Sequence, residues 1–354
     1  MSKRFSILCI AAMVFALLSC NKESGNVVLA DVAESTPLRL VVGVEGAGST
    51  KVTGITSNDP TTEAKVNSLQ VFVFNGDALD GYAAKADSKT LTVSCTSGIR
   101  DIYALVNAPN LASVTSKAAL LATVSNLTNE VSNFQMIGHK TETLKHEGNV
   151  EIGVDRLAAR VVIRGIKNAI ENAAQAAAFK VLSVYLTNVV GDVDYGFSSS
   201  YEPTVWKNRR GYEATNSFGS FDYDFVNANV AAGATNSDVH FFYSYPNSKE
   251  PFVGLAAGET HYTGRRACLV IKAEITGVVY DYPIQLPVLQ NNKSYEINLV
   301  NITRVGNIDD GNHDPDDGND TDEEKPIVGF DQGFEITVND WNVVLVGGDG
   351  NITI

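Results

Sequence analysis

Most of the chain alternates apolar and polar residues with a period of two, which is the pattern of β-strands that bury one face. The run SLQVFVFNGD places Leu69, Val71 and Val73 on one face. Its Asn75-Gly76 pair predicts a tight turn. Similar runs include RDIYALVNAP, FKVLSVYLTNVV, DVHFFYSYPN, RACLVIKAEITGVVYDYPIQLPV and SYEINLVNITRV. Many short strands with Gly, Asn and Pro turns predict a mainly β protein built from antiparallel β-sandwiches.

Two segments depart from this period. Residues 113–136 carry apolar residues at steps of three and four, which predicts one or two amphipathic helices broken near Asn126. The Ala-rich run NAIENAAQAAAF is compatible with a second short helix. The length of 354 residues allows two domains. We place the break between the two sandwiches near Asp155, where one series of strands has ended, which gives domains at 52–155 and 156–306.

The N-terminus has the pattern of a secretory signal peptide over residues 1–19. Lys3 and Arg4 precede an apolar stretch that is too short to remain as a membrane span. The stretch ends in Leu17-Leu18-Ser19-Cys20, which resembles the bacterial lipobox, so we expect Cys20 to become a diacylated, palmitate-bearing residue. The alternative is an ordinary signal peptide in which this cysteine is accidental. The following Asn21-Lys22-Glu23 resembles the signals that send lipoproteins of the Bacteroidetes to the cell exterior.

Charge and cysteine content exclude several classes of protein. The formal net charge is −14, which makes phosphate backbones poor partners and argues against a nucleic-acid role. Once the signal peptide and Cys20 are set aside, Cys95 and Cys268 remain, far apart and both in strand-like runs. Two buried free thiols are favoured over a disulfide bridge between them.

No residue pattern nominates a catalytic, cofactor or metal site. The five histidines are scattered, and no nucleophile elbow, phosphate loop or dinucleotide fingerprint is present. The acidic run at 307–325 invites a calcium hypothesis, but a loop starting at Asp310 places Pro315 where an EF-hand needs glycine. A self-repelling, extended linker is the preferred interpretation.

An apolar strand is predicted near each end of the chain. In TPLRLVVGVEG, one face carries Leu38, Leu40, Val42 and Val44. Burial of four such side chains contributes about 6–12 kcal/mol before ordering costs, at about 1.5–3 kcal/mol each. The next residues, GAGSTK, resemble the loop tips that proteases cut.

The second such strand lies in the C-terminal segment 326–354, which follows the linker and is expected to be held away from the sandwiches. Its apolar residues are Phe334, Ile336 and Val338 at even positions and Trp341, Val343 and Leu345 at odd positions. We interpret the phase change at Asp340 as a β-bulge. Two interchangeable strands, each next to a feature that frees it, are what donor-strand exchange requires. The alternative is that both are ordinary edge strands of one sandwich.

These features together resemble a FimA-type fimbrillin, the major pilus subunit of Bacteroidetes. The lipobox, the alternating first strand, a Gly/Ser loop with a basic residue and KVNSLQVFVFNG are similar to the start of that family. RLAARVVI, from Arg156 to Ile163, resembles the strand that opens its second domain, and FEITVNDWNVV resembles its C-terminal strand. The resemblance implies two transthyretin-like β-sandwiches joined end to end, with a C-terminal donor strand.

The resemblance also implies how such a chain matures. Family members are exported as lipoproteins, trimmed by a trypsin-like protease and assembled by strand exchange. The family usually carries Arg at the cleavage position, whereas this loop offers Lys51, which favours a cut between Lys51 and Val52 and makes residues 20–51 a lipidated propeptide. The implied partners are further copies of the subunit, fimbrial tip and anchor subunits, the maturation protease and, through the lipid, the outer membrane.

The expected function is therefore that of a non-enzymatic structural subunit of a cell-surface fimbrium that serves adhesion. The alternative is a monomeric surface lipoprotein or tip adhesin. It would bind glycan or host protein through the aromatic loop at 195–225, where Arg209 and Arg210 accompany Tyr, Trp and Phe. A loop that only covers the second sandwich is the simpler interpretation of that segment.

Overall fold

The computed structural model describes residues 37–45, 63, 65–130, 133–145, 147–209, 217, 219–247, 266–309, 334–336, 342–345 and 351–354. The predictions about Cys20, Lys51, Val52, Val338 and Trp341 lie outside these residues and stay predictions.

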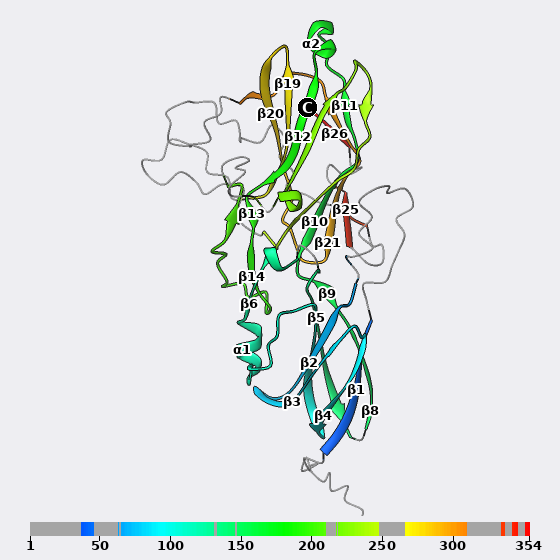
Figure 1. Cartoon of the computed structure of the whole chain (residues 1–354), viewed down its shortest axis with the longest axis vertical. Coiled ribbons are helices and arrows are strands. Elements are labelled where there is room, and N and C mark those ends of the chain that lie inside the picture. The colour runs from blue at the N-terminus through cyan, green and yellow to red at the C-terminus, as the bar shows by residue number, and fades with distance from the viewer. Residues whose placement is uncertain are drawn as a thin grey trace, which may run out of the picture. The chain divides into compact units, whose positions relative to one another are not determined.

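Strand β1 is the first described strand of the chain and the middle strand of its sheet, as Figure 1 shows in dark blue. The sheet has the order β4–β1–β8 and consists of β1 (Pro37–Glu45), β4 (Thr90–Thr96) and β8 (Gly148–Gly153). β1 runs antiparallel to β4 and parallel to β8. All three strands alternate buried and exposed side chains, so one face of this sheet packs on the core, as the period-two pattern predicts.

A second sheet, entirely antiparallel, completes the N-terminal sandwich. Its order is β3–β2–β5–β7–β9, with β2 (Ser68–Asn75), β3 (Ala78–Ala86), β5 (Gly98–Val106), β7 (Met136–Leu144) and β9 (Asp155–Arg156). β2 buries every side chain from Leu69 to Phe74, so both of its faces are covered. The predicted turn after β2 is present, and Gly76 has φ 62°, a value that favours glycine.

The helical content of residues 113–136 is smaller than predicted. α1 (Lys117–Leu121) begins after Ser116, whose hydroxyl accepts a hydrogen bond from the Ala119 N–H at 3.1 Å. The chain then forms β6 (Val124–Asn126) and the 3₁₀ turn η1 (Leu127–Glu130) instead of a second helix. β6 pairs with β14 of the C-terminal half, and the low helix propensity of Val, Ser and Asn favours this pairing. The second predicted helix is α2 (Ala173–Ala177), capped by Asn172.

One side of the C-terminal sandwich consists of two sets of hydrogen-bonded strands. Along the chain, β10, β21 and β25 of the first set are followed directly by β11, β22 and β26 of the second. The first set has the order β18–β10–β21–β25–β24, with β10 (Ala159–Ile163), β18 (His240–Ser244), β21 (Lys293–Ile297), β24 (Phe334–Ile336) and β25 (Asn342–Leu345). The second has the order β17–β11–β22–β26, with β11 (Ile166–Asn168), β17 (Thr235–Asn236), β22 (Leu299–Ile302) and β26 (Asn351–Thr353).

The remaining strands oppose and flank these sets. The opposing sheet has the order β16–β12–β19–β20–β23, with β12 (Lys180–Thr187), β16 (Tyr223–Asn229), β19 (Cys268–Ile275), β20 (Val278–Gln285) and β23 (Asn307–Ile308). Short pairs join β13 (Val189–Val190) to β15 (Trp206–Lys207) and β14 (Asp192–Asp194) to β6, and η3 (Gly219–Phe221) precedes β16. The predicted mainly β class with one or two short helices is confirmed. The sheets are mixed rather than purely antiparallel, because β10, β11, β21 and β22 all make parallel pairs.

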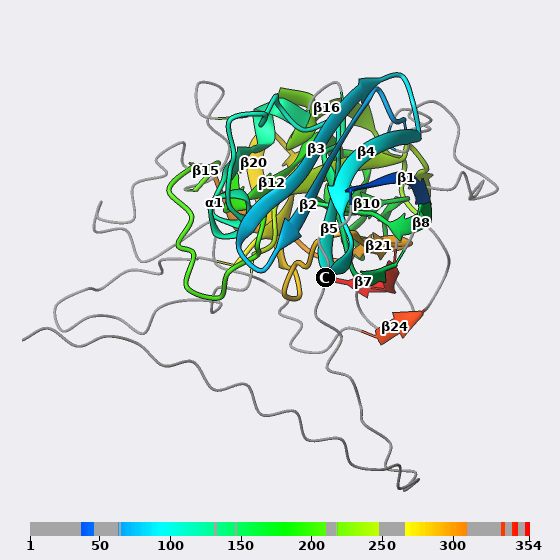
Figure 2. The same ribbon diagram turned by 90° about the horizontal axis from the view of Figure 1, so that it is seen from below.

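The C-terminal part of the chain, from residue 307 onward, differs from the sequence prediction in three ways. β24 and β25 pair antiparallel with Phe334 opposite Leu345, so they form a hairpin and not one bulged strand. The reversal of the chain between the two strands also accounts for the change of phase. The segment is not held away from the sandwiches, because β25 pairs with β21 and β26 pairs with β22; Figure 2 shows β24 at the outside of this sheet. Finally, Asn307–Ile308, assigned to the linker, pair with β20.

Candidate functional site

The apolar face of β1 is the best-defined candidate site. Leu38, Leu40, Val42 and Val44 are 7%, 2%, 0% and 8% exposed, as the alternation predicts. Arg39, on the other face, is exposed. Val42 lies opposite Leu91 of β4 and Val150 of β8. The four side chains therefore fill a slot between two strands that do not pair with each other.

The walls of this slot are attached to the opposite sheet independently of β1. A Cβ added at Gly138 of β7 would lie 2.1 Å from the carbonyl oxygen of Gly153, at the end of β8. A Cβ added at Gly81 of β3 would lie 2.3 Å from the carbonyl oxygen of Ser94 in β4. Only glycine permits these close approaches of the two backbones. β4 thus packs against β3, and β8 packs against β7, without the participation of β1.

A buried ion pair adds a second attachment for β4. Asp80 of β3 accepts hydrogen bonds from the Thr96 N–H at 2.7 Å and from Arg100 Nε at 2.8 Å. Burial opposes ionisation of Asp80, but the hydrogen bonds from Thr96 and Arg100 outweigh it and lower the pKa of this carboxyl. The charged carboxylate therefore joins β3, the end of β4 and β5.

Glu63 is the first described residue after β1, and it is held by the C-terminal sandwich. Its carboxylate lies 3.1 Å from Arg160 Nη1 of β10 and accepts a hydrogen bond from the Tyr243 hydroxyl of β18. Its carbonyl oxygen accepts from Arg156 Nε at 3.1 Å. Burial and the neighbouring Glu63 charge raise the pKa of Tyr243, so its hydroxyl remains a donor. The chain between β1 and β2 is consequently fixed at its C-terminal end.

A second buried carboxyl lies between the two halves of the chain. Glu130 of η1 is 0% exposed and accepts from the Gln135 N–H at 2.8 Å and from the Tyr245 hydroxyl at 2.9 Å. Burial raises the pKa of Glu130 to about 8, although both hydrogen bonds and the Arg156 charge act in the opposite direction. Tyr245 also shares a hydrogen bond of 2.8 Å with Ser125 of β6.

Sequence reasoning did not single out Glu63, Arg160 or Glu130 as functional positions. The available signal was the pair of arginines at 156 and 160 within an otherwise apolar strand, because a buried arginine requires an acidic partner. Nothing in the sequence identifies Glu63 as that partner.

The C-terminal sandwich repeats the arrangement around β1. β10 lies between an antiparallel strand, β18, and a parallel strand, β21, as β1 lies between β4 and β8. β25 then pairs in parallel with the other edge of β21. Of the predicted donor residues, Phe334 pairs with Leu345 and Ile336 pairs with Val343 through their backbones. Further along the chain, Ile352 and Ile354 are buried in the core.

Where the aromatic loop at 195–225 is described, some of its rings pack inward, whereas Phe225 is 66% exposed. Tyr195 and Phe221 are buried, and the Phe221 ring lies 4.7 Å from that of Tyr243 and 5.8 Å from that of Phe134. Arg209 lies over the Trp206 ring at 5.5 Å. This agrees with a loop that covers the sandwich, although residues 197–203 also line a pocket.

Other site predictions have simpler outcomes. Cys95 and Cys268 are both buried, as predicted, and Cys95 is a free thiol. Within the described part of the chain, no group of three or more His, Cys, Asp and Glu side chains is placed to hold a metal ion. No helix among the described residues is long and apolar enough to cross a membrane.

The fold defines a mainly β protein of two sandwiches whose first described strand is central to its sheet. Residues 36–156 match the family model of the major fimbrial subunit protein FimA. The resemblance to FimA-type fimbrillins is therefore confirmed, over the residues that contain β1, its slot and the N-terminal sandwich. No curated protein sequence matches the chain significantly.

Solved structures share the fold over most of the chain. A proposed cell adhesion protein from Bacteroides eggerthii is similar with a TM-score of 0.58 and 15% identity, over 90% of this chain and 98% of that one. The fimbrilin FimA of Porphyromonas gingivalis is similar with a TM-score of 0.53 and 16% identity, over 88% and 96%. A proposed cell adhesion protein from Parabacteroides distasonis is similar with a TM-score of 0.54 and 16% identity, over 77% and 94%.

Proposed function

We propose that this chain is a structural subunit of a cell-surface fimbrium that polymerises by donor-strand exchange and serves adhesion. The observation that supports this most strongly is the position of β1, which is the first described strand but lies in the middle of its sheet. The segment between β1 and Glu63 joins β1 covalently to the other described strands. A single cut in that segment leaves it held by non-covalent contacts alone.

Export and anchoring precede this cut. Residues 1–19 act as the signal peptide, and Cys20 carries the lipid that anchors the precursor to the outer membrane. Replacement of Cys20 by Ala should abolish labelling of the protein with a radioactive fatty acid. Persistent label on the Cys20→Ala variant would contradict the assignment.

Cleavage between Lys51 and Val52 switches assembly on. Before the cut, covalent attachment gives β1 an effective concentration of order millimolar or more at its slot. A strand from another subunit is far more dilute, so it cannot displace β1. After the cut, β1 can leave and a neighbour's strand fills the slot, which joins subunits head to tail in an open filament.

The donor is the segment from Phe334 to Leu345. The parallel pairing of β25 with β21 supports this role, because β1 makes the same kind of pairing with β8. For the donor to act as one long strand, the β24–β25 hairpin must open. The maturation protease and the tip and anchor subunits of the fimbrium are the other partners of the chain.

Trypsin treatment of the purified precursor tests the switch. We expect fibres by negative-stain microscopy and a new N-terminus at Val52. Lys51→Ala should leave an unpolymerised precursor. Arg39→Ala, the matched control within β1, should still mature. Fibres whose subunits keep residues 38–44 in their own slot would rule the mechanism out.

The donor is better tested by substitution than by deletion. Deletion of residues 334–354 also removes Ile352 and Ile354, which are 1% and 4% exposed, and so damages the C-terminal core. Val343→Asp should block polymerisation of the cleaved subunit, because it places a charge in the apolar slot. Asn342→Asp, on the opposite face of an extended strand, should not. Fibres of normal length from Val343→Asp would place the exchanging strand elsewhere.

A further inference from the structure

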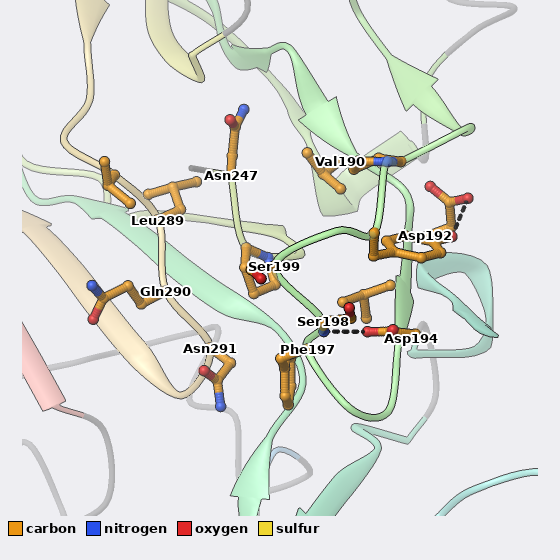
Figure 3. Close-up of a pocket in the computed structure, with 15 residues that line it drawn as sticks. Val190, Asp192, Asp194, Phe197, Ser198, Ser199, Asn247, Leu289, Gln290 and Asn291 are labelled. Carbon is orange, nitrogen blue, oxygen red and sulfur yellow. Dashed lines mark hydrogen bonds between the residues drawn. The ribbon is translucent and has the colours of Figure 1, made fainter. Parts of the chain in front are cut away.

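A pocket in the C-terminal sandwich lies apart from β1, its slot and the donor segment. Its volume is about 320 Å³, near the lower end of the range for small-molecule sites. Three stretches of chain line it: residues 190–203 from β13 onward, Pro246–Asn247 after β18, and residues 288–291 before β21. Figure 3 shows Ser198 and Asp194 on one side of the pocket and Leu289, Gln290 and Asn291 across from them.

The wall formed by residues 190–205 is held in place by buried carboxylates. Asp192 accepts hydrogen bonds from the Thr204 N–H at 3.0 Å, the Val205 N–H at 3.0 Å and the Tyr201 hydroxyl at 2.8 Å. Asp194 accepts from the Ser198 N–H at 2.9 Å. Because these bonds occupy both oxygens of Asp192, that carboxylate shapes the wall and is not available to pair with a ligand cation.

The opposite wall is equally fixed. Asn247 and Leu289 exchange backbone hydrogen bonds of 3.0 and 3.1 Å, and the Asn247 amide donates to the Asn188 carbonyl at 3.1 Å. The Gln290 N–H donates to the Tyr295 hydroxyl at 2.8 Å. The pocket is therefore formed before any ligand arrives, which reduces the entropy lost on binding.

The chemistry of the lining selects the kind of ligand. No Lys, Arg or His lines the pocket, and two aspartates do, so anions are disfavoured. The side chains of Ser199, Gln290 and Asn291 make no hydrogen bond to another described residue. Amides and hydroxyls both donate and accept, as sugar hydroxyls do. Val288 and the ring of Phe197, both partly exposed, supply apolar surface for the C–H face of a sugar ring.

Phe197 adds a further indication that this wall is specialised. Its φ is 46°, in the left-handed region that a bulky residue rarely adopts. Such backbone conformations persist where the surrounding structure imposes them, and they cluster at ligand sites. We infer that the pocket binds an uncharged sugar, such as the terminal hexose or N-acetylhexosamine of a glycan. This inference is independent of strand exchange, because it uses none of the exchanging residues.

Saturation-transfer NMR on the uncleaved precursor tests the site. The probes are the methyl glycosides of glucose, galactose, mannose, N-acetylglucosamine and N-acetylgalactosamine, with sialic acid and cadaverine as charged comparisons. We expect at least one neutral glycoside to bind. Gln290→Ala and Asn291→Ala should each weaken it about 2- to 10-fold through the loss of a hydrogen bond. Ser199→Trp should abolish binding by filling the pocket.

Asn229→Ala is the matched control, because Asn229 is exposed on β16 and does not line the pocket. Thermal unfolding of each variant checks that the fold is retained. Three results would overturn the inference: no signal from any neutral glycoside, preferential binding of sialic acid or cadaverine, or equal binding by the wild type and the folded pocket variants.

Discussion

The carboxylate of Glu63 lies 3.1 Å from the Arg160 guanidinium, and the two side chains are 3% and 4% exposed. Arg160 also donates to the Ser294 hydroxyl at 2.9 Å, and Arg156 donates to the Glu63 carbonyl. Glu63, which precedes β2, is thus fixed to β9 by Arg156, to β10 by Arg160 and to β18 by the Tyr243 hydroxyl. A cut anywhere between β1 and Glu63 would leave this attachment intact.

Loss of the Glu63 charge should strongly destabilise the protein. Glu63→Gln leaves Arg160 with one fewer acidic partner in a buried site, and breaking a buried ion pair costs about 3–5 kcal/mol. Urea unfolding of the precursor measures the change. The exposed Lys140–Glu142 pair offers a control, since Glu142→Gln should change the free energy of unfolding by less than about 0.5 kcal/mol. Equal effects of the two substitutions would show that the Glu63 contacts contribute little.

The close approach of β7 and β8 predicts a sharp difference between two glycines. An alanine Cβ at position 138 would lie 2.1 Å from a backbone oxygen, whereas at position 153 it meets nothing within 4 Å. We expect Gly138→Ala to lower the free energy of unfolding by about 1–3 kcal/mol or more. Gly153→Ala should be nearly neutral. A stable Gly138→Ala variant would mean that the β8 wall is not attached as described.

Alanine substitutions at Leu40 and Val41, which are neighbours in β1, should differ in their effect on the free energy of unfolding. Leu40→Ala removes a side chain that is 2% exposed and should cost about 2–5 kcal/mol in the uncleaved precursor. Val41→Ala, at a side chain 36% exposed, should cost less than about 0.5 kcal/mol. After cleavage, Leu40→Ala should also release β1 faster and shorten the delay before fibres form. A delay unchanged by Leu40→Ala would show that β1 release does not limit assembly.

Glu130 should make the protein less stable as the pH rises. Its ordinary pKa is 4.5, and burial raises the pKa in the folded chain to about 8, so the folded state binds the proton more tightly. The contribution of Glu130 to the free energy of unfolding should therefore be fully present below the lower value and be lost as the pH rises to the higher one. Glu130→Gln should flatten this dependence, as measured by urea unfolding across the interval. Glu142→Gln should keep the wild-type slope; a flat slope in both variants would assign the effect to other groups.

Local pattern was sufficient to predict the strands around the slot. The alternation of Leu38, Leu40, Val42 and Val44 predicted the buried face of β1, because a half-buried strand must repeat every second residue. Local pattern was not sufficient for residues 124–126, where pairing with β14 overrides the helical spacing of apolar residues.

Long-range partners could not be predicted from the sequence. The Glu63–Arg160 pair joins residues 97 positions apart, and no spacing rule encodes such a contact. The apolar residues change from even to odd positions around Asp340. A hairpin and a single bulged strand both produce such a change, so the pattern alone does not distinguish them. The pocket could be anticipated only as an aromatic loop, because two of its three lining stretches lie far away in sequence.

Under the proposed strand exchange, the middle position of β1 also determines which form of the subunit a cell can store. Loss of an edge strand would expose one unpaired strand, but loss of β1 exposes both β4 and β8 and the apolar residues between them. A cleaved subunit without a neighbour would therefore capture any extended peptide it met. The uncleaved precursor is the form that can be kept in reserve, so the growth rate of a fibre should follow the local supply of protease more closely than the supply of subunits.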